Sequence, residues 1–377
     1  MAGIYLHIPF CRKRCAYCDF YSTTRDELRQ RTVDALCCEL RSRSSYLRGE
    51  SVRTLYLGGG TPSQLSPQQL NQLFQTVDEV YGLEDIEELT LEANPDDLTQ
   101  AYVSALRQLP VNRISMGVQT FDDDTLRLLN RRHTAQQALE AIDRLRNAGF
   151  DNLSIDLIYG LPGETAERWE RDLAQAVALG VEHLSAYSLT YEEGTPLHRL
   201  LTQHRVSEVD EDDSLLFYTR LMEVMEEEGY EQYEISNFCR PGRHSRHNSS
   251  YWEGIPYLGC GPSAHSYNGV EREWNVASLT RYLEASEAGG RDYECEQLDI
   301  DTRYNEYVMT RLRTRRGASL LEVERLFGLP RKEYLLRMAH PFLQQGLLEQ
   351  TSEGFLRFRR EGLFTSDAVM SELMYIE

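Results

Sequence analysis

Short β-rich runs alternate with helical patterns through the first half of the chain, and this alternation limits the possible fold more than any other feature. Six such runs can be recognised, each followed by a turn and mostly by a helical pattern: residues 4–8, 54–60, 88–94, 113–120, 152–160 and 183–190. Strands that alternate with helices are typical of parallel pairs joined by right-handed crossovers. The sequence therefore predicts an α/β fold built on a parallel sheet.

The number of strand–helix units indicates the shape of this sheet. A barrel closes with eight such units, so six units predict a partial (β/α)6 barrel that stays open on one side. Such an opening would admit a bulky substrate. Functional loops in sheets of this kind lie at the carboxyl ends of the strands, and we expect the site there.

The alternation is lost after residue 190, and we expect three regions in the chain. The barrel occupies residues 1–238, a loop-rich connecting segment occupies residues 239–295, and a small domain occupies residues 296–377. Short helices and a hairpin pattern predict a winged-helix-like α+β fold for the last region. That shape invites a DNA-binding interpretation, but the region is about charge-neutral and a packing role is an equally good explanation.

Charge and hydropathy exclude several classes of protein. A net charge of −20 repels phosphate backbones, so nucleic acid is not expected as a partner. No apolar run approaches the roughly 18 residues of a membrane span, and the amino terminus lacks a signal-peptide pattern, so we expect a cytoplasmic protein. In that reducing compartment, clustered cysteines indicate metal or redox chemistry rather than disulfides.

Three of the eight cysteines lie close together in the sequence CRKRCAYC, directly after the first predicted strand. Cys11, Cys15 and Cys18 have no fourth cysteine nearby. A zinc site would need a fourth ligand, supplied by His7 or by a distant residue. A four-iron cluster held by only three thiolates leaves one iron open to a small molecule. We favour the cluster and interpret the other five cysteines as buried free thiols.

Polar or glycine-rich motifs also end the next four strands. Residues 58–62 read GGGTP, and Glu92, Gln119 and Asp156 end the third, fourth and fifth strands. Because the carboxyl ends of parallel strands meet at one edge, we expect these groups to face one pocket beside the cysteines. For each residue taken singly, a tight turn, a helix cap or a salt bridge is the competing explanation.

The cysteine motif followed by GGGTP resembles the radical S-adenosylmethionine (SAM) superfamily. The resemblance implies a 4Fe–4S cluster on the three cysteines, with its open iron chelated by the methionine part of SAM. It also implies that the barrel is a radical SAM barrel and that the strand ends contact this cofactor. The positions that match SAM contacts are Tyr5, Gly59, Gly60, Thr61, Glu92, Gln119, Arg131 and Asp156.

Over almost its whole length the sequence is similar to the oxygen-independent coproporphyrinogen III oxidase family, through motifs such as DLIYGLPGET, GCGPSAHSY and RHNSSYW. This similarity implies a tetrapyrrole ligand and two possible functions: oxidative decarboxylation of coproporphyrinogen, or a haem chaperone that passes haem to acceptor proteins. The oxidases have another cysteine two residues after the third, and a longer amino-terminal extension. Here Phe20 takes that place and only ten residues precede Cys11. We therefore predict the chaperone, with the oxidase as the alternative.

The segment RHNSSYW, residues 246–252, resembles an H-N-x-x-Y-W motif of the haem-chaperone subfamily. The motif makes His247 the candidate axial ligand of haem iron, and Tyr251 and Trp252 could pack on the macrocycle. In the competing interpretation His247 satisfies a loop carbonyl and the aromatic rings fill core. The resemblance further implies that respiratory membrane proteins accept the haem and that cluster loading favours a homodimer.

Overall fold

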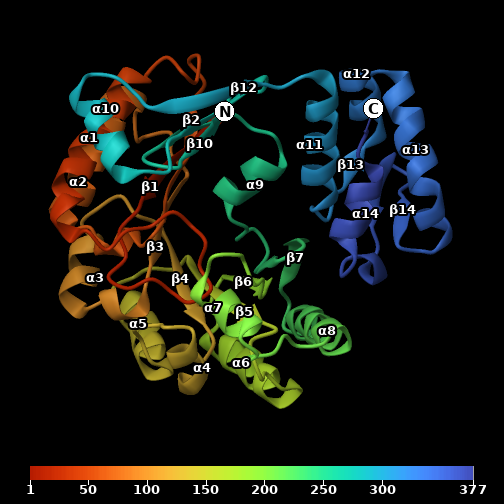
Figure 1. Cartoon of the computed structure of the whole chain (residues 1–377), viewed down its shortest axis with the longest axis horizontal. Coiled ribbons are helices and arrows are strands. Elements are labelled where there is room, and N and C mark those ends of the chain that lie inside the picture. Colours follow the sequence, from red (N-terminus) through yellow and green to blue (C-terminus); the bar gives the residue numbers. More distant parts are fainter. Residues whose placement is uncertain (377) are drawn as a thin grey trace.

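The computed structural model describes residues 1–376, and one 12-stranded sheet forms most of its body (Figure 1). The strand order is β12-β11-β10-β9-β1-β2-β3-β4-β5-β6-β8-β7. Six central strands pair in parallel and overlap the predicted runs to within two residues at their carboxyl ends: β1 (Ala2–Ile8), β2 (Val52–Gly59), β3 (Glu88–Ala93), β4 (Arg113–Gln119), β5 (Leu153–Tyr159) and β6 (His183–Ser188). The predicted parallel α/β fold is confirmed.

Helices connect the central strands and lie around the outside of the curved sheet (Figure 1). They are α1 (Arg29–Ser42), α2 (Pro67–Tyr81), α3 (Gln100–Leu106), α4 (Asp123–Leu128), α5 (Ala135–Asn147) and α6 (Ala166–Leu179), with the 3-10 turns η1 (Asp26–Leu28), η2 (Pro62–Gln64) and η3 (Pro95–Asp97). Each long helix buries an apolar stripe, such as Leu70, Leu73 and Val77 of α2, which begins at a capping box of Ser66 and Gln69. Within residues 1–376 no helix is long and apolar enough to cross a lipid bilayer.

The segment 239–295 is not the loop-rich connection that we expected. It contributes a helix, α9 (Arg246–Trp252), a second helix, α10 (Leu279–Glu287), and the strands β9 (Tyr257–Cys260), β10 (His265–Tyr267), β11 (Glu271–Asn275) and β12 (Tyr293–Gln297). Strand β9 pairs in parallel with β1, so the sheet continues past its first strand. These strands escaped prediction because they are short, and in β12 every side chain is exposed, which removes the apolar alternation that marks a strand.

Two antiparallel strands extend the sheet at its other edge, beyond β6. After β6 come the helices α7 (Pro196–Thr202) and α8 (Glu211–Glu227) and the strands β7 (Glu231–Glu234) and β8 (Asn237–Cys239). Strand β8 pairs with β6 in the antiparallel direction. The sheet therefore ends at β7 without meeting β12, which agrees with an open partial barrel.

The last part of the chain forms a separate layer with its own apolar core around Tyr304, Val308, Leu335 and Leu356. Its elements are α11 (Ile300–Leu312), β13 (Ala318–Ser319), α12 (Leu320–Phe327), α13 (Leu329–Gln344), β14 (Leu348–Gln350), β15 (Phe355–Phe358), η4 (Arg360–Gly362) and α14 (Ser366–Leu373). A three-stranded sheet beside helices has the predicted winged-helix-like form. The region boundaries at residues 238 and 295 stay proposals.

Candidate functional site

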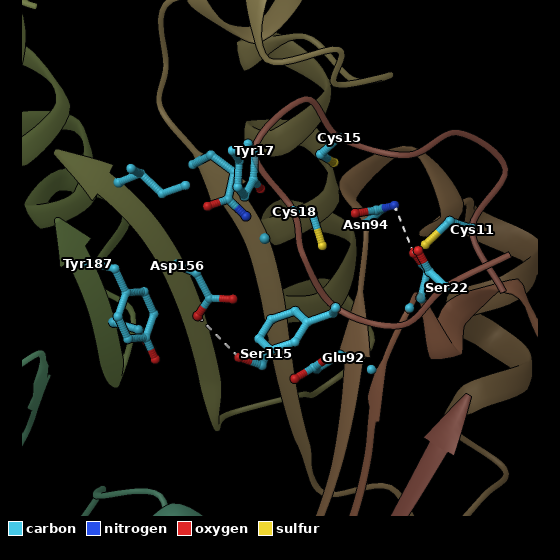
Figure 2. A pocket seen from close by; sticks show the side chains of 18 of the residues that line it. Cys11, Cys15, Tyr17, Cys18, Ser22, Glu92, Asn94, Ser115, Asp156 and Tyr187 are labelled. Carbon is cyan, nitrogen blue, oxygen red and sulfur yellow. Dashed lines mark hydrogen bonds between the residues drawn. The ribbon is translucent and has the colours of Figure 1, made fainter. Parts of the chain in front are cut away.

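One cavity of about 740 Å³ lies at the carboxyl ends of the central strands, and every residue predicted for the site lines it. Figure 2 shows the cysteine loop on one side of this cavity and the side chains of Glu92, Ser115 and Asp156, from three neighbouring parallel strands, on the other. We call it the cluster cavity. The residues in question are Tyr5, Cys11, Cys15, Cys18, Gly59, Gly60, Thr61, Glu92, Gln119, Arg131, Asp156 and His247. Asp156 lies in the middle of β5 and not at its end, where the sequence predicts it.

The cysteine loop is closed at its base by backbone hydrogen bonds. The Thr23 N–H donates to the Pro9 carbonyl at 2.7 Å, and the Cys11 N–H donates to the Thr23 carbonyl at 2.9 Å. The Cys11 Sγ lies 3.4 Å from the Thr61 Oγ1 of the glycine motif. The Arg131 Nη1 donates to the Cys15 Sγ at 3.2 Å, so a cation stands beside the thiols.

The donor set of this loop fits an iron–sulfur cluster. All three thiols are partly exposed to the cavity, and burial raises the pKa of Cys18 to about 11. In residues 1–376 no three His, Cys, Asp or Glu side chains are grouped around a single metal position. In an iron–sulfur cluster each thiolate binds a different iron atom, so the three sulfur atoms need not surround a single metal position. Cys11, Cys15 and Cys18 could therefore hold the cluster.

His7 is not placed as a fourth ligand. It is buried beneath the glycine motif, its Nε2 lies 2.9 Å from the Tyr21 carbonyl and its Nδ1 lies 3.2 Å from the Tyr5 hydroxyl. Burial lowers the pKa of His7 to about 4, so the ring is neutral. The ring supports the motif from below instead of pointing at the cysteines.

The glycine motif requires bare backbone. Gly59 has a φ of +104°, and a Cβ there would lie 2.5 Å from the His7 ring. A Cβ on Gly60 would lie 2.7 Å from the Pro9 carbonyl carbon, in the backbone that leads into the cysteine loop. Only glycine allows β2 to pass so close to that loop. The exposed peptide groups could hold the zwitterionic end of SAM.

Two acids form the floor of the cavity. Glu92 accepts a hydrogen bond from the Tyr56 hydroxyl at 2.7 Å, and burial, with the nearby charge of Asp156, raises the pKa of Glu92 to about 7. Burial also raises the pKa of Asp156, which accepts a hydrogen bond from Ser115 (3.4 Å, Figure 2). Carboxylates in this position could accept the hydroxyls of a ribose.

A strained residue and an arginine form the wall next to the cysteines. Gln119 has a φ of +71° at a bulge between β4 and β5, a conformation that costs a non-glycine residue about 1 kcal/mol or more. The bulge turns its side chain into the cavity. Arg131 is fixed by the Asn94 Oδ1 at 2.8 Å and the Gly117 carbonyl at 2.5 Å.

His247 lies on α9, at the opposite wall. It is 1% exposed, its Nδ1 lies 2.8 Å from the Thr54 hydroxyl and its Nε2 lies 2.8 Å from the Tyr251 hydroxyl. Burial lowers the pKa of His247 to about 3, so the ring is neutral, the form that ligates a metal. The Nε2 can reach haem iron only if the Tyr251 hydroxyl moves away. The expected loop carbonyl is not its partner.

Several lining residues were missed by sequence reasoning. Arg113 is 1% exposed and carries two buried nitrogens, Nε and Nη1, that have no partner in residues 1–376. The contact between Ser115 and Asp156 could have been predicted, because side chains alternate along a strand and both residues occupy inward-facing positions of neighbouring strands. Further lining residues that were missed include Tyr17, Tyr56, Asn94, Ser185, Tyr187 and Asn248.

The other cysteines only partly match expectation. Cys37, Cys239 and Cys260 are buried, as predicted, whereas Cys38 and Cys295 are exposed. Cys38 lies on the solvent side of α1, and Cys295 lies on β12, where no neighbour covers it.

The chain matches two family models and several relatives of known sequence. Residues 5–176 match the radical SAM superfamily, and residues 298–364 match the HemN C-terminal domain. "Heme chaperone HemW" of Bacillus subtilis is 32% identical over 381 residues, which covers 99% of both chains. The protein of the same description from Lactococcus lactis is 37% identical over 323 residues, covering 86% of this chain and 84% of the relative.

A solved structure shares the whole fold. It is the coproporphyrinogen III oxidase (HemN) from Escherichia coli, with a TM-score of 0.85 at 24% identity, covering 99% of this chain and 90% of that one. At this identity the likeness concerns the fold alone. The two proteins therefore share one fold. In this chain Phe20 lies on the cysteine loop, and its side chain is 64% exposed.

Proposed function

The chain belongs to the HemW family of the radical SAM superfamily, and we propose that it is a haem chaperone that carries a 4Fe–4S cluster and SAM and transfers haem to acceptor proteins. One observation carries the proposal. The cysteine loop, the glycine motif and the H-N-x-x-Y-W helix α9 line the same cavity, although they lie far apart in the sequence.

The cluster cavity supplies a separate role for each group. Cys11, Cys15 and Cys18 would hold the cluster, which supplies an open iron for the methionine amino and carboxylate groups. The peptide groups of residues 59–61 would bind the amino group. Arg131, 3.2 Å from Cys15, would offset the negative charge of the thiolates.

The remaining contacts to SAM come from side chains on the strands. Glu92 and Asp156 would accept hydrogen bonds from the ribose hydroxyls of SAM, and the Gln119 amide would donate a hydrogen bond to the SAM carboxylate. Tyr5 lies at the cavity wall, and its hydroxyl is held 3.2 Å from the His7 Nδ1. In this position the Tyr5 ring could cover the cofactor.

For haem we propose His247 as the axial ligand. Release of Tyr251 from the His247 Nε2 would free a neutral imidazole, which is a common ligand of haem iron. We further propose that the protein works in the cytoplasm, that respiratory membrane proteins accept its haem, and that cluster loading favours a homodimer.

Haem uptake and product analysis under strict anoxia test this function. Protein reconstituted with iron and sulfide is titrated with haemin and, separately, incubated with coproporphyrinogen III, SAM and a reductant. We expect stoichiometric haem binding and no protoporphyrinogen. Product formed over many turnovers would instead establish the oxidase.

The ligand is tested with His247→Ala, with His340→Ala, an exposed histidine on α13, as control. We expect a changed haem spectrum and at least tenfold weaker binding in the first variant only. An unchanged spectrum and affinity would place the iron ligand on another residue without affecting the evidence for haem binding.

A further inference from the structure

A second cavity, of about 450 Å³, lies between the barrel and the carboxyl-terminal layer. Its walls come from α9, from β9–β11 and from α11 and α12, and Figure 1 shows α9 facing α11. The volume falls within the range of small-molecule sites. We call it the interdomain cavity.

Six aromatic side chains line the interdomain cavity. Tyr251 and Tyr257 meet edge to face at 4.7 Å, and the Trp252 Nε1 is buried without a partner in residues 1–376. Flat apolar ligands pack well against such rings. The aromatic residues are Tyr251, Trp252, Tyr257, Tyr267, Tyr307 and Phe327.

Within residues 1–376, two of the four arginines that line the interdomain cavity form no ion pair, and one of its three acids, the exposed Glu253, forms none either. Arg272 pairs with Glu306 at 2.7 Å, and Arg311 lies 4.0 Å from Glu322. Within the described part of the chain, Arg303 and Arg325 line the same cavity with no carboxylate at ion-pair distance. Two unpaired guanidinium groups beside an aromatic surface suit a flat ligand with two carboxylates.

The H-N-x-x-Y-W helix connects the two cavities. His247 and Asn248 face the cluster cavity, Trp252 faces the interdomain cavity, and Tyr251 lines both. The Tyr251 side chain therefore separates the two spaces. The movement that frees the His247 Nε2 would also open this wall.

We infer that the interdomain cavity is the seat of the haem macrocycle, with its propionates on Arg303 and Arg325, while the cluster cavity holds the cluster and SAM. This inference rests on the proposed haem-binding function. Haem and SAM would then occupy different spaces on the two sides of Tyr251. The partly exposed Met309 and Leu326 form an apolar rim through which haem could enter and leave.

The arginines are tested by the double variant R303E/R325E in the full chain. Haemin and metal-free protoporphyrin IX are titrated, and absorbance and fluorescence report binding. We expect both probes to bind at least tenfold more weakly, because two attractions to carboxylates become repulsions. The control R171E/R205E makes the same charge change at exposed arginines outside both cavities and should bind as wild type.

A second variant tests the space instead of the charge. Thr310→Trp places an indole in the interdomain cavity from α11, and we expect it to block both porphyrins. Unchanged melting temperatures and iron contents show that the variants are folded. SAM should leave the haemin affinity of wild type unchanged, because the two ligands occupy different cavities.

The outcomes separate this inference from the proposed function. If wild type binds haemin but R303E/R325E and T310W bind it equally well, or if SAM displaces haemin, the interdomain seat is wrong and haem binding stands. If wild type binds neither porphyrin, both fail.

Discussion

Among single residues, three thiols and two buried acids determine what the cluster cavity can hold. Cys11, Cys15 and Cys18 share one loop and one cavity, while the other cysteines lie elsewhere in the fold. Glu92 and Asp156 lie below that loop, where burial favours their protonated forms. The thiols and the acids each lead to a measurable prediction.

Removing any one ligand should abolish the cluster. After anaerobic reconstitution we expect Cys15→Ala to retain little iron or sulfide, because a cluster with only two protein thiolates is poorly held. The exposed Cys38→Ala serves as control and should load fully. Chemical iron and sulfide analysis measures both, and full loading of the Cys15 variant would refute the assignment.

Glu92 should make the stability of the protein depend on pH. Its pKa is raised from the usual 4.5 to about 7, so the folded chain binds this proton more tightly than the unfolded chain. Its contribution to the free energy of unfolding is therefore full below pH 4.5 and is lost as the pH rises through about 7. A tenfold change in proton affinity between the folded and unfolded chains corresponds to about 1.4 kcal/mol.

Glu92→Gln should remove this dependence, since glutamine keeps an acceptor for Tyr56 and carries no charge. Above the raised pKa we expect the variant to be more stable than wild type by about 1–3 kcal/mol, with the difference shrinking toward lower pH. Urea unfolding at several pH values measures it. A constant difference across that range would contradict the protonation argument.

Among the elements, α9 is a seven-residue helix whose first N–H groups donate to a buried acid on strand β3. Glu88 of β3 is 3% exposed and accepts the N–H groups of Arg246 and His247 at 2.9 and 3.0 Å. A carboxylate at this end of a helix satisfies free N–H groups and favours the helix dipole. Strand β3 thereby positions the residue that we propose as haem ligand.

Glu88→Gln should loosen α9. We expect a loss of about 1–3 kcal/mol in the free energy of unfolding, because one charged acceptor is lost in a buried place. Faster hydrogen exchange at residues 246–248 would show that the effect is local. The matched control Glu87→Gln removes an exposed partner of Arg246 and Arg53 and should cost less than about 1 kcal/mol. Equal losses in the free energy of unfolding for Glu88→Gln and Glu87→Gln would contradict the proposed role of Glu88 in holding α9.

Across the molecule as a whole, the sheet joins segments that are distant in sequence. Strand β9 brings residues 257–260 beside β1, and this pairing carries α9 to the cluster cavity. The carboxyl-terminal layer then covers the far side of α9 and forms the interdomain cavity. The layer has a winged-helix-like form, and its helices α11 and α12 supply one wall of this cavity.

The whole chain should not bind DNA. Its net charge of −20 opposes contact with phosphates, and binding driven by charge would be strongest at low salt. We expect no mobility shift of duplex DNA even at low ionic strength. A shift that weakens as salt is added would show that the winged-helix-like layer acts on nucleic acid.

The parallel α/β core and part of the lining of the cluster cavity could be predicted from the order of the amino acids. Strand–helix alternation is a local pattern, and the carboxyl ends of parallel strands meet wherever such a sheet forms. Cys11, Gly59, Glu92 and Asp156 could therefore be placed at one edge before any coordinates. All of them line one cavity.

Other features arise only when the chain folds. Strand β9 depends on backbone pairing with the distant β1, and β10–β12 extend the sheet from β9. Every side chain of β12 is exposed, so its sequence carries no apolar period. Likewise, the hydrogen bonds of His247 to Thr54 and Tyr251 and the placement of Tyr251 between two cavities follow from packing across the sheet. Local sequence specifies strand ends and motifs, whereas contacts between distant segments depend on how the whole sheet is assembled.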